Sequence, residues 1–201
     1  MASKYQLEHS LIYIAQSDVP HNKLGITDSE ELHEIERELL EEAYQVFNSE
    51  LNEKCVFNEA YFKSLHQRTF ESLYDWAGKY RDFNMIKGNS RFCQGDYVES
   101  SSQKLFSELE KANYLQDISK SKTEFVQNLA YFKGELIALH PFYELNGRIT
   151  RLFFDMLVRY NGYQYIDYSG ISPECYINVA IECVQFADCA AMKRIIMDGL
   201  K

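Results

Sequence analysis

One short stretch, residues 140–151, gathers side chains whose types and spacing could do chemistry. Its sequence is HPFYELNGRITR. His140 carries an imidazole, the side chain whose ordinary pKa suits it to take a proton near neutral pH. The residue before a proline avoids helical geometry, so a helix that reaches His140 must end there, and a new helix is expected to begin at Asn146 or Gly147. The free backbone N–H groups at such a helix start bind anions, because the helix dipole favours negative charge there.

Two arginines and one carboxylate surround that helix start. Cations are disfavoured in the first turn of a helix, yet Arg148 and Arg151 both lie there, three residues apart and therefore on one face. An anion with several charges, such as a polyphosphate, would explain both guanidinium groups. Glu144 lies just outside the helix start, and phosphates near a carboxylate usually share a Mg²⁺ ion with it, because Mg²⁺ prefers oxygen ligands. The stretch therefore predicts phosphate chemistry with His140 as the proton acceptor.

Each of these residues also has a purely structural explanation. Asn146 could be an ordinary N-cap, and Gly147 could merely be permissive. His140 could be a hydrogen-bonded loop histidine, and the arginines could pair with surface acids. The joint arrangement of a histidine, an acid, helix-start amides and two arginines within twelve residues favours phosphate chemistry.

The same stretch resembles the signature of the Fic family, H-P-F-x-[DE]-G-N-G-R-x-x-R. Every specified position matches except one, where Leu145 replaces glycine. Upstream, residues 74–81 (YDWAGKYR) followed by residues 86–88 (IKG) resemble the family's approach to its target-docking hairpin, the flap. The resemblance covers roughly residues 20–200 and implies a Fic-type helical bundle with one small β-hairpin beside the active-site loop.

The resemblance implies a protein adenylyltransferase, which transfers AMP from ATP to a hydroxyl side chain of a target protein. His140 would be the general base that activates the hydroxyl, and Glu144 would bind the Mg²⁺ that bridges the α- and β-phosphates. Phe142 would anchor the loop in the core. The helix start would bind the nucleotide through Asn146 and Gly147 at the anion hole, Arg148 near the β-phosphate and Arg151 at the γ-phosphate.

The hairpin over residues 84–93 would dock the target protein as an added strand. Lys87 and Gly88 in this hairpin are expected to contribute to nucleotide binding and to align the target. The family's inhibitory string, [ST]-x-x-x-E-[GN], is not found in the sequence, since Leu32 follows Thr27 to Glu31 and Lys54 follows Ser49 to Glu53. The resemblance therefore implies the toxin part of a toxin–antitoxin pair, restrained by a separate small antitoxin protein, with a type II topoisomerase as the expected target.

Leu145 leaves other functions open. Glycine allows positive φ and a close approach of backbone to phosphate, which leucine does not readily allow. If φ is positive here, the α-phosphate could be misplaced, and about 1 Å of misplacement costs on the order of a hundredfold in rate. One alternative is a degenerate Fic fold that acts as a nucleotide-binding or interaction module; another is a Fic transferase with another nucleotide donor, against which Gly147 argues. A metallo-hydrolase is disfavoured, because the five histidines show no H-E-x-x-H spacing.

Composition narrows the partners and the location. A chain of 201 residues predicts one domain over residues 1–201, of which about the first 20 form an irregular arm. The net charge of −9 and the lack of a Lys/Arg-rich run disfavour nucleic acid and membranes as partners. Five cysteines without a C-x-x-C pair argue against a disulfide framework or a structural zinc site. Reduced thiols, no secretory signal over residues 1–13 and no membrane-spanning run lead us to expect a cytoplasmic protein.

Hydrophobic periodicity predicts an all-α class with one small hairpin. The first helix is expected to open with a capping box of Thr27 and Glu30, and the second to follow Asn58. The hairpin should have strands over residues 80–86 and 91–93. Further helices are predicted over about residues 101–113, 124–139 and 146–160, with one or two more over residues 173–198.

Overall fold

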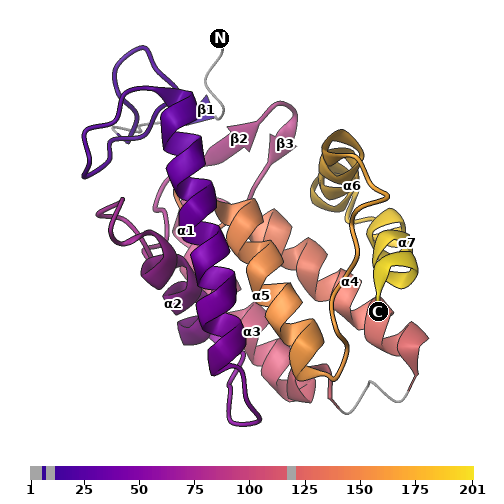
Figure 1. Ribbon diagram of the computed structural model, residues 1–201. Helices are drawn as coiled ribbons and strands as arrows, with labels where there is room; N and C mark the ends of the chain where they lie inside the picture. Colours follow the sequence, from indigo (N-terminus) through magenta and orange to yellow (C-terminus); the bar gives the residue numbers. More distant parts are fainter. Residues whose placement is uncertain (1–5, 8–11, 117–120) are drawn as a thin grey trace.

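The computed structural model describes residues 6–7, 12–116 and 121–201, and within these residues it is an all-α fold with one small sheet (Figure 1). The prediction of the fold class is confirmed. The helices are α1 (Ser29–Glu50), α2 (Glu59–Phe70), α3 (Val98–Lys111), α4 (Lys122–Leu139), α5 (Asn146–Tyr160), α6 (Pro173–Phe186) and α7 (Ala190–Gly199). The strands are β1 (Gln6–Leu7), β2 (Met85–Lys87) and β3 (Ser90–Arg91).

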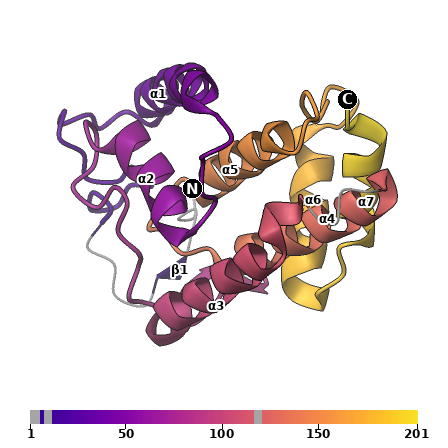
Figure 2. The same cartoon turned by 90° about the horizontal axis from the view of Figure 1, so that it is seen from below.

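Helices α4 and α5 form the centre of the fold. Helix α4 packs against α3, α5, α6 and α7, while α5 packs against α1, α2 and α4. Figure 2 shows α1 and α2 on one side of this pair and α6 and α7 on the other. The stripe of apolar side chains along α5 is buried, and each such side chain stabilises the fold by about 1.5–3 kcal/mol. The core therefore fixes both ends of the loop that joins α4 to α5.

The N-termini of the first two helices test the predicted caps. The capping box at Thr27 was wrong: α1 is capped by Asp28, whose carboxylate accepts a hydrogen bond from the N–H of Glu31 at 2.8 Å. A carboxylate at this position also carries the negative charge that the helix dipole favours. Asn58 caps α2 as expected, accepting from the N–H of Tyr61 at 2.9 Å.

The hairpin is shorter than predicted. Residues 80–84 do not belong to a strand, because Tyr80 forms a bridge with Phe142 and the N–H of Arg81 donates to the carbonyl of Pro141 at 2.8 Å. The backbone there is thus bonded to the α4–α5 loop rather than to the return strand. In β2 and β3, Lys87 pairs with Ser90, and Gly88 turns the chain with a φ of 57°. A further strand, β1, pairs with β2 and was not predicted.

Two separate helices, α6 and α7, occupy the C-terminal part. Helix α6 ends where Ala187 adopts a left-handed conformation with φ 53°. The side chain of Gln185 in α6 donates to the hydroxyl of Ser90 in β3 at 3.1 Å, so α6 is tied to the hairpin. Among the helices that the structure describes, none combines the length and the apolar character that crossing a bilayer requires.

Candidate active site

His140 lies at the C-terminal end of α4 in a left-handed conformation, with φ 47° and ψ 59°. Its backbone N–H still donates to the carbonyl of Leu136 at 3.2 Å, whereas Pro141 cannot continue the helix. The imidazole stacks on the ring of Phe92, with centroids 3.8 Å apart and 15° between the planes. Nδ1 faces the carbonyl of Ile137 at 3.4 Å, and a proton on Nδ1 leaves Nε2 with the lone pair that a general base needs.

Arg81 holds the His140 backbone to the hairpin. Its buried guanidinium donates to the carbonyls of His140 (2.8 Å), Leu139 (3.1 Å), Cys93 (2.6 Å) and Phe83 (2.5 Å). Burial lowers the pKa of Arg81 to about 10, so it stays charged at neutral pH. Sequence reasoning did not assign it a place at the site. Its position at the end of residues 74–81 was a signal, but its partners are carbonyls that only the fold brings together.

His66 holds the loop that follows His140. The N–H of Gly78 donates to Nδ1 of His66 at 3.0 Å, so the proton of the neutral ring is on Nε2, which donates to the carbonyl of Glu144 at 3.1 Å. The ring stacks on Phe142, with centroids 3.9 Å apart, and both are fully buried. Burial lowers the pKa of His66 to about 4, which keeps it neutral. Sequence reasoning missed this histidine as well, because nothing in its neighbourhood marks it as a loop partner.

The side chain of Asn146 closes the loop on itself. Its Oδ1 accepts from the N–H of Phe142 at 2.7 Å, and its Nδ2 donates to the carbonyl of the same residue at 2.8 Å. The N-cap position of α5 belongs to Leu145, which has a φ of 66°. A left-handed leucine costs about 1–2 kcal/mol. The residue is only 6% exposed, and the burial of its side chain offsets the strain with about 1.5–3 kcal/mol.

The carboxylate of Glu144 is buried beside this loop. Its Oε1 accepts a hydrogen bond from the hydroxyl of Tyr13, and its Oε2 faces the N–H of Leu145 at 3.4 Å. Within the described residues, no three side chains of His, Cys, Asp or Glu form a group that could hold a metal ion. A single carboxylate suits Mg²⁺ where phosphates and waters supply the other ligands.

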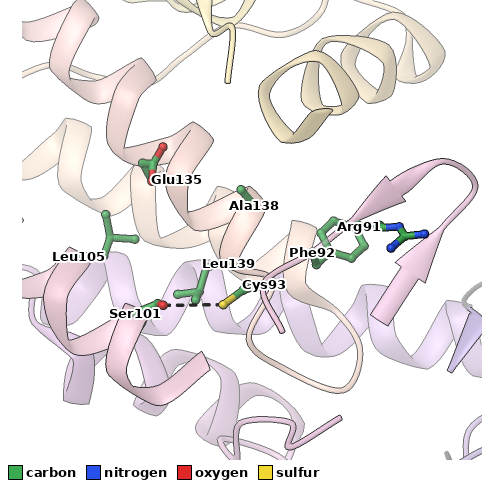
Figure 3. A pocket seen from close by; sticks show the side chains of 8 residues that line it. All are labelled: Arg91, Phe92, Cys93, Ser101, Leu105, Glu135, Ala138 and Leu139. Carbon is green, nitrogen blue, oxygen red and sulfur yellow. Dashed lines mark hydrogen bonds between the residues drawn. The ribbon is translucent and has the colours of Figure 1, made fainter. Parts of the chain in front are cut away.

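A cavity of about 350 Å³ opens between β3, α3 and α4, and Arg91 of β3 lies at its edge (Figure 3). Phe92, Cys93, Ser101 and Glu135 line it, and the thiol of Cys93 donates to the hydroxyl of Ser101 at 3.7 Å.

A second cavity, of about 320 Å³, brings four of the predicted site residues together. His140, Gly147, Lys87 and Gly88 all line it. Its volume lies in the range of small-molecule sites. Phe92 lines this cavity as well as the one in Figure 3. The opposite wall is apolar and comes from α6, through Ile177, Ala180, Ile181 and Val184.

Arg148 and Arg151 line a neighbouring cavity of about 500 Å³, together with residues of α1. Arg148 forms an ion pair with Glu36 at 2.8 Å, and Glu36 also accepts from the hydroxyl of Tyr74 at 2.6 Å. The guanidinium of Arg151 lies over the ring of Tyr168, 3.9 Å from its centroid. The two arginines thus share one face of α5, as expected. The structure does not place them in the cavity of His140, although Gly147, which lines that cavity, directly precedes Arg148.

Comparison with known proteins identifies the family. The sequence model that describes the Fic/DOC family matches residues 56–158 of the chain. A probable protein adenylyltransferase, y4lH, of Sinorhizobium fredii is 33% identical over 166 residues, which are 81% of this chain and 82% of that protein. The chain belongs to the Fic/DOC family. The probable protein adenylyltransferase Fic of Escherichia coli is 30% identical over 178 residues, covering 89% of this chain and 86% of its own length.

Two solved structures share the fold of the chain. The N-terminal Fic domain of a cell filamentation protein from Bartonella quintana, with bound ADP, has a TM-score of 0.81 at 27% identity and covers 94% of each chain. BepC from Bartonella tribocorum, with bound AMPPNP, has a TM-score of 0.80 at 23% identity, covering 94% of this chain and 96% of its own. Because BepC is only 23% identical to the chain, this similarity supports the fold alone.

Proposed function

We propose that this chain is a protein adenylyltransferase, a nucleotidyltransferase that transfers AMP from ATP to a hydroxyl side chain of a target protein. One observation carries the proposal: a histidine at the end of α4, the start of α5 and the turn of the hairpin line one cavity. The relatives named probable protein adenylyltransferases, and the ADP bound in the related Fic domain from Bartonella quintana, support the same activity.

In the proposed reaction, His140 takes the proton of the target hydroxyl. The hydroxyl oxygen attacks the α-phosphorus, the bond between this phosphorus and the bridging oxygen of the β-phosphate breaks, and pyrophosphate leaves. The amides at the start of α5 stabilise the charge on the α-phosphate, because they point toward an anion at the helix N-terminus. A Cβ added to Gly147 would meet no protein atom within 4 Å, so this position is open to a phosphate.

The adenosine part would lie against the apolar wall of α6. The remaining phosphates would extend across the start of α5 to Arg148 and Arg151 in the neighbouring cavity. Glu36 supports this assignment, because a buried carboxylate holds Arg148 in one orientation at that cavity. Arg151 is held over Tyr168 in a similar way.

Glu144 is the residue proposed to hold Mg²⁺ with the phosphates. When bound, the ion would neutralise phosphate charge as pyrophosphate leaves. Glu144 would then exchange its hydrogen bond from Tyr13 for the metal.

The target segment is proposed to lie along residues 84–93. Among the strands that the structure describes, β3 is the outer one in the order β1–β2–β3, which gives an edge for an added strand. The further parts of this proposal are a type II topoisomerase as target, a separate antitoxin protein as inhibitor and a cytoplasmic location. The relative VbhT of Bartonella schoenbuchensis, 32% identical over 182 residues, matches over 37% of its length, so the rest of VbhT lies outside the match.

The test uses the purified chain with Mg²⁺, α-labelled ATP and a bacterial lysate. Label should appear on at least one lysate protein with the wild type and disappear with His140→Ala. An absence of labelled protein, with wild type and His140→Ala giving the same result, would contradict the proposal.

A nucleotide-binding or interaction module is the second candidate, and the left-handed Leu145 is the observation that favours it. It predicts that ATP binds, or does not bind, but that no protein is ever labelled. Titration of the chain with ATP, followed by the labelling assay on the same sample, separates the two functions.

A further inference from the structure

Two cysteine thiols meet where α6 gives way to α7. Sγ of Cys183, in α6, lies 2.9 Å from Sγ of Cys189, the N-cap residue of α7. Cys183 is buried, whereas Cys189 is half-buried and reaches solvent. A disulfide bond is about 2.0 Å long, so the two sulfurs need to approach by only about 0.9 Å to form one.

The backbone around the pair brings the sulfurs together. Ala187 reverses the chain in a left-handed conformation, which turns Cys189 back toward Cys183. On the other side, α4 presents Gly134, where an added Cβ would lie 2.2 Å from Sγ of Cys189 and 3.5 Å from Sγ of Cys183. A glycine in the middle of a helix is destabilising relative to alanine. At position 134, the absence of a side chain leaves room for both thiols.

The thiol pair has one member suited to react first. Cys189 has access to solvent, and its hydrogen bond with Cys183 lowers its pKa, while burial, Glu135 and Asp188 act in the opposite direction. The thiolate is the reactive form of cysteine. Its hydrogen bond with Cys189 and its burial raise the pKa of Cys183, which makes Cys183 the second, resolving thiol.

We propose that Cys183 and Cys189 form a modification site that accepts a reversible disulfide from a low-molecular-weight disulfide of the glutathione class. The thiolate of Cys189 attacks one sulfur of glutathione disulfide, and the first glutathione leaves as a thiolate. Cys183 then loses its proton and attacks the sulfur of Cys189 in the mixed disulfide, which releases the second glutathione. The protein loses two hydrogen atoms, and one glutathione disulfide becomes two glutathione thiols. A reversible bond of this kind is compatible with a reducing compartment.

The bond would act on the wall of the cavity that holds His140. Val184 lies next to Cys183 in the chain and lines that cavity, and Gln185 bonds α6 to Ser90 of the hairpin. A disulfide would fix the end of α6 against α7 and so hold this wall in place. The effect of this disulfide on ATP binding rests on the proposed function. A wall held in its binding conformation loses less freedom when ATP binds, so the Kd for ATP should fall by roughly two- to fivefold.

The first experiment treats the native, full-length protein with glutathione disulfide and maps its peptides by mass spectrometry. The wild type should yield a peptide that links Cys183 to Cys189. Cys183→Ser should instead keep one glutathione on Cys189, as the trapped intermediate, and Cys189→Ser should leave Cys183 unmodified. Cys175→Ser, at an exposed position of the same helix, is the matched control and should still form the 183–189 link.

The results separate the site from its effect on nucleotide. No 183–189 link in the folded wild type, or the same adducts on all variants, would overturn the modification site. If the link forms and the Kd for ATP is unchanged or rises, the effect on α6 is wrong while the site stands. If the reduced wild type binds no ATP, the proposed function fails and the peptide map still decides whether the disulfide forms.

Discussion

Phe92 and His140 stack face to face, with ring centroids 3.8 Å apart and 15° between the planes. Phe92 follows the return strand of the hairpin, whereas His140 ends α4. The orientation of the proposed base therefore depends on the hairpin, and the hairpin is bonded in turn to α6 through Ser90 and Gln185.

Replacing Phe92 with alanine tests this dependence. Without the stacked ring, the imidazole of His140 gains freedom to rotate, and kcat for AMP transfer should fall roughly ten- to hundredfold. The Kd for ATP should change less than kcat, because Phe92 is only one of the residues that line the cavity, and the α5 start and the α6 wall remain. Phe83→Ala is a suitable control, since Phe83 packs on Tyr143 and does not stack on His140. An unchanged kcat for Phe92→Ala would show that the stacking does not position the base.

Gly147→Ala separates the fold from the site. No protein atom lies within 4 Å of an added Cβ, and alanine favours a helix, so the free energy of unfolding should stay the same or rise by up to about 1 kcal/mol. The new methyl group would point into the cavity, and we expect a tenfold or greater increase in the Kd for ATP, of the order expected for a blocked contact. Gly170→Ala, which also meets no neighbour, should leave both quantities unchanged. Unimpaired ATP binding by Gly147→Ala would place the phosphates elsewhere.

Leu145→Gly should have a higher free energy of unfolding than Leu145→Ala, although glycine is the smaller residue. Both lose the buried side chain, but glycine also relieves the left-handed strain, which leaves a net loss of about 1–2 kcal/mol. Leu145→Ala keeps the left-handed strain, and its free energy of unfolding should fall by about 2–5 kcal/mol. It should therefore be the less stable variant. Chemical denaturation measures both. If alanine is the more stable of the two, Leu145 does not have a positive φ in solution.

Arg81→Lys tests the four carbonyl contacts at the end of α4. A lysine keeps the charge but cannot donate to four carbonyls in a fork, so the free energy of unfolding should fall by about 2–4 kcal/mol. Arg159→Lys, at an exposed position of α5, is the control and should change stability by less than about 0.5 kcal/mol. Equal stability of the two variants would mean that the fork is not needed.

His66 should make stability depend on pH. Its pKa is lowered from 6.5 to about 4 in the folded protein, so folding favours the neutral ring. This contribution is fully present above pH 6.5 and is lost as the pH falls through 4, because the unfolded chain takes up the proton first. Its size is about 3 kcal/mol.

The measurement compares urea unfolding of the wild type and His66→Gln at several pH values between 7.5 and 4. The stability of the wild type should fall more steeply than that of the variant, which has no imidazole at this position. His33→Gln, at an exposed position, should follow the wild type. Parallel curves for wild type and His66→Gln would contradict a neutral, buried His66.

The local features of this protein could be predicted from its sequence. Helical spacing and stop signals are properties of neighbouring residues, so the end of α4 before His140 was predicted correctly, its start at residue 124 was wrong by two residues, and the start of α5 was predicted at Asn146 or Gly147 and lies at Asn146. The cap of α1 was wrong by one residue, because Thr27 and Asp28 are both good caps and the backbone decides between them.

Contacts between distant residues depended on the tertiary structure. Glu36, Arg81 and His66 lie 112, 59 and 78 residues from Arg148, His140 and Glu144, to which they bond, and no local pattern marks such partners. The sequence determined which residues gather at the start of α5. The packing of α1, α6 and the hairpin around that start decided that His140 and Gly147 face one cavity while Arg148 and Arg151 face another, because cavities form between elements rather than within them.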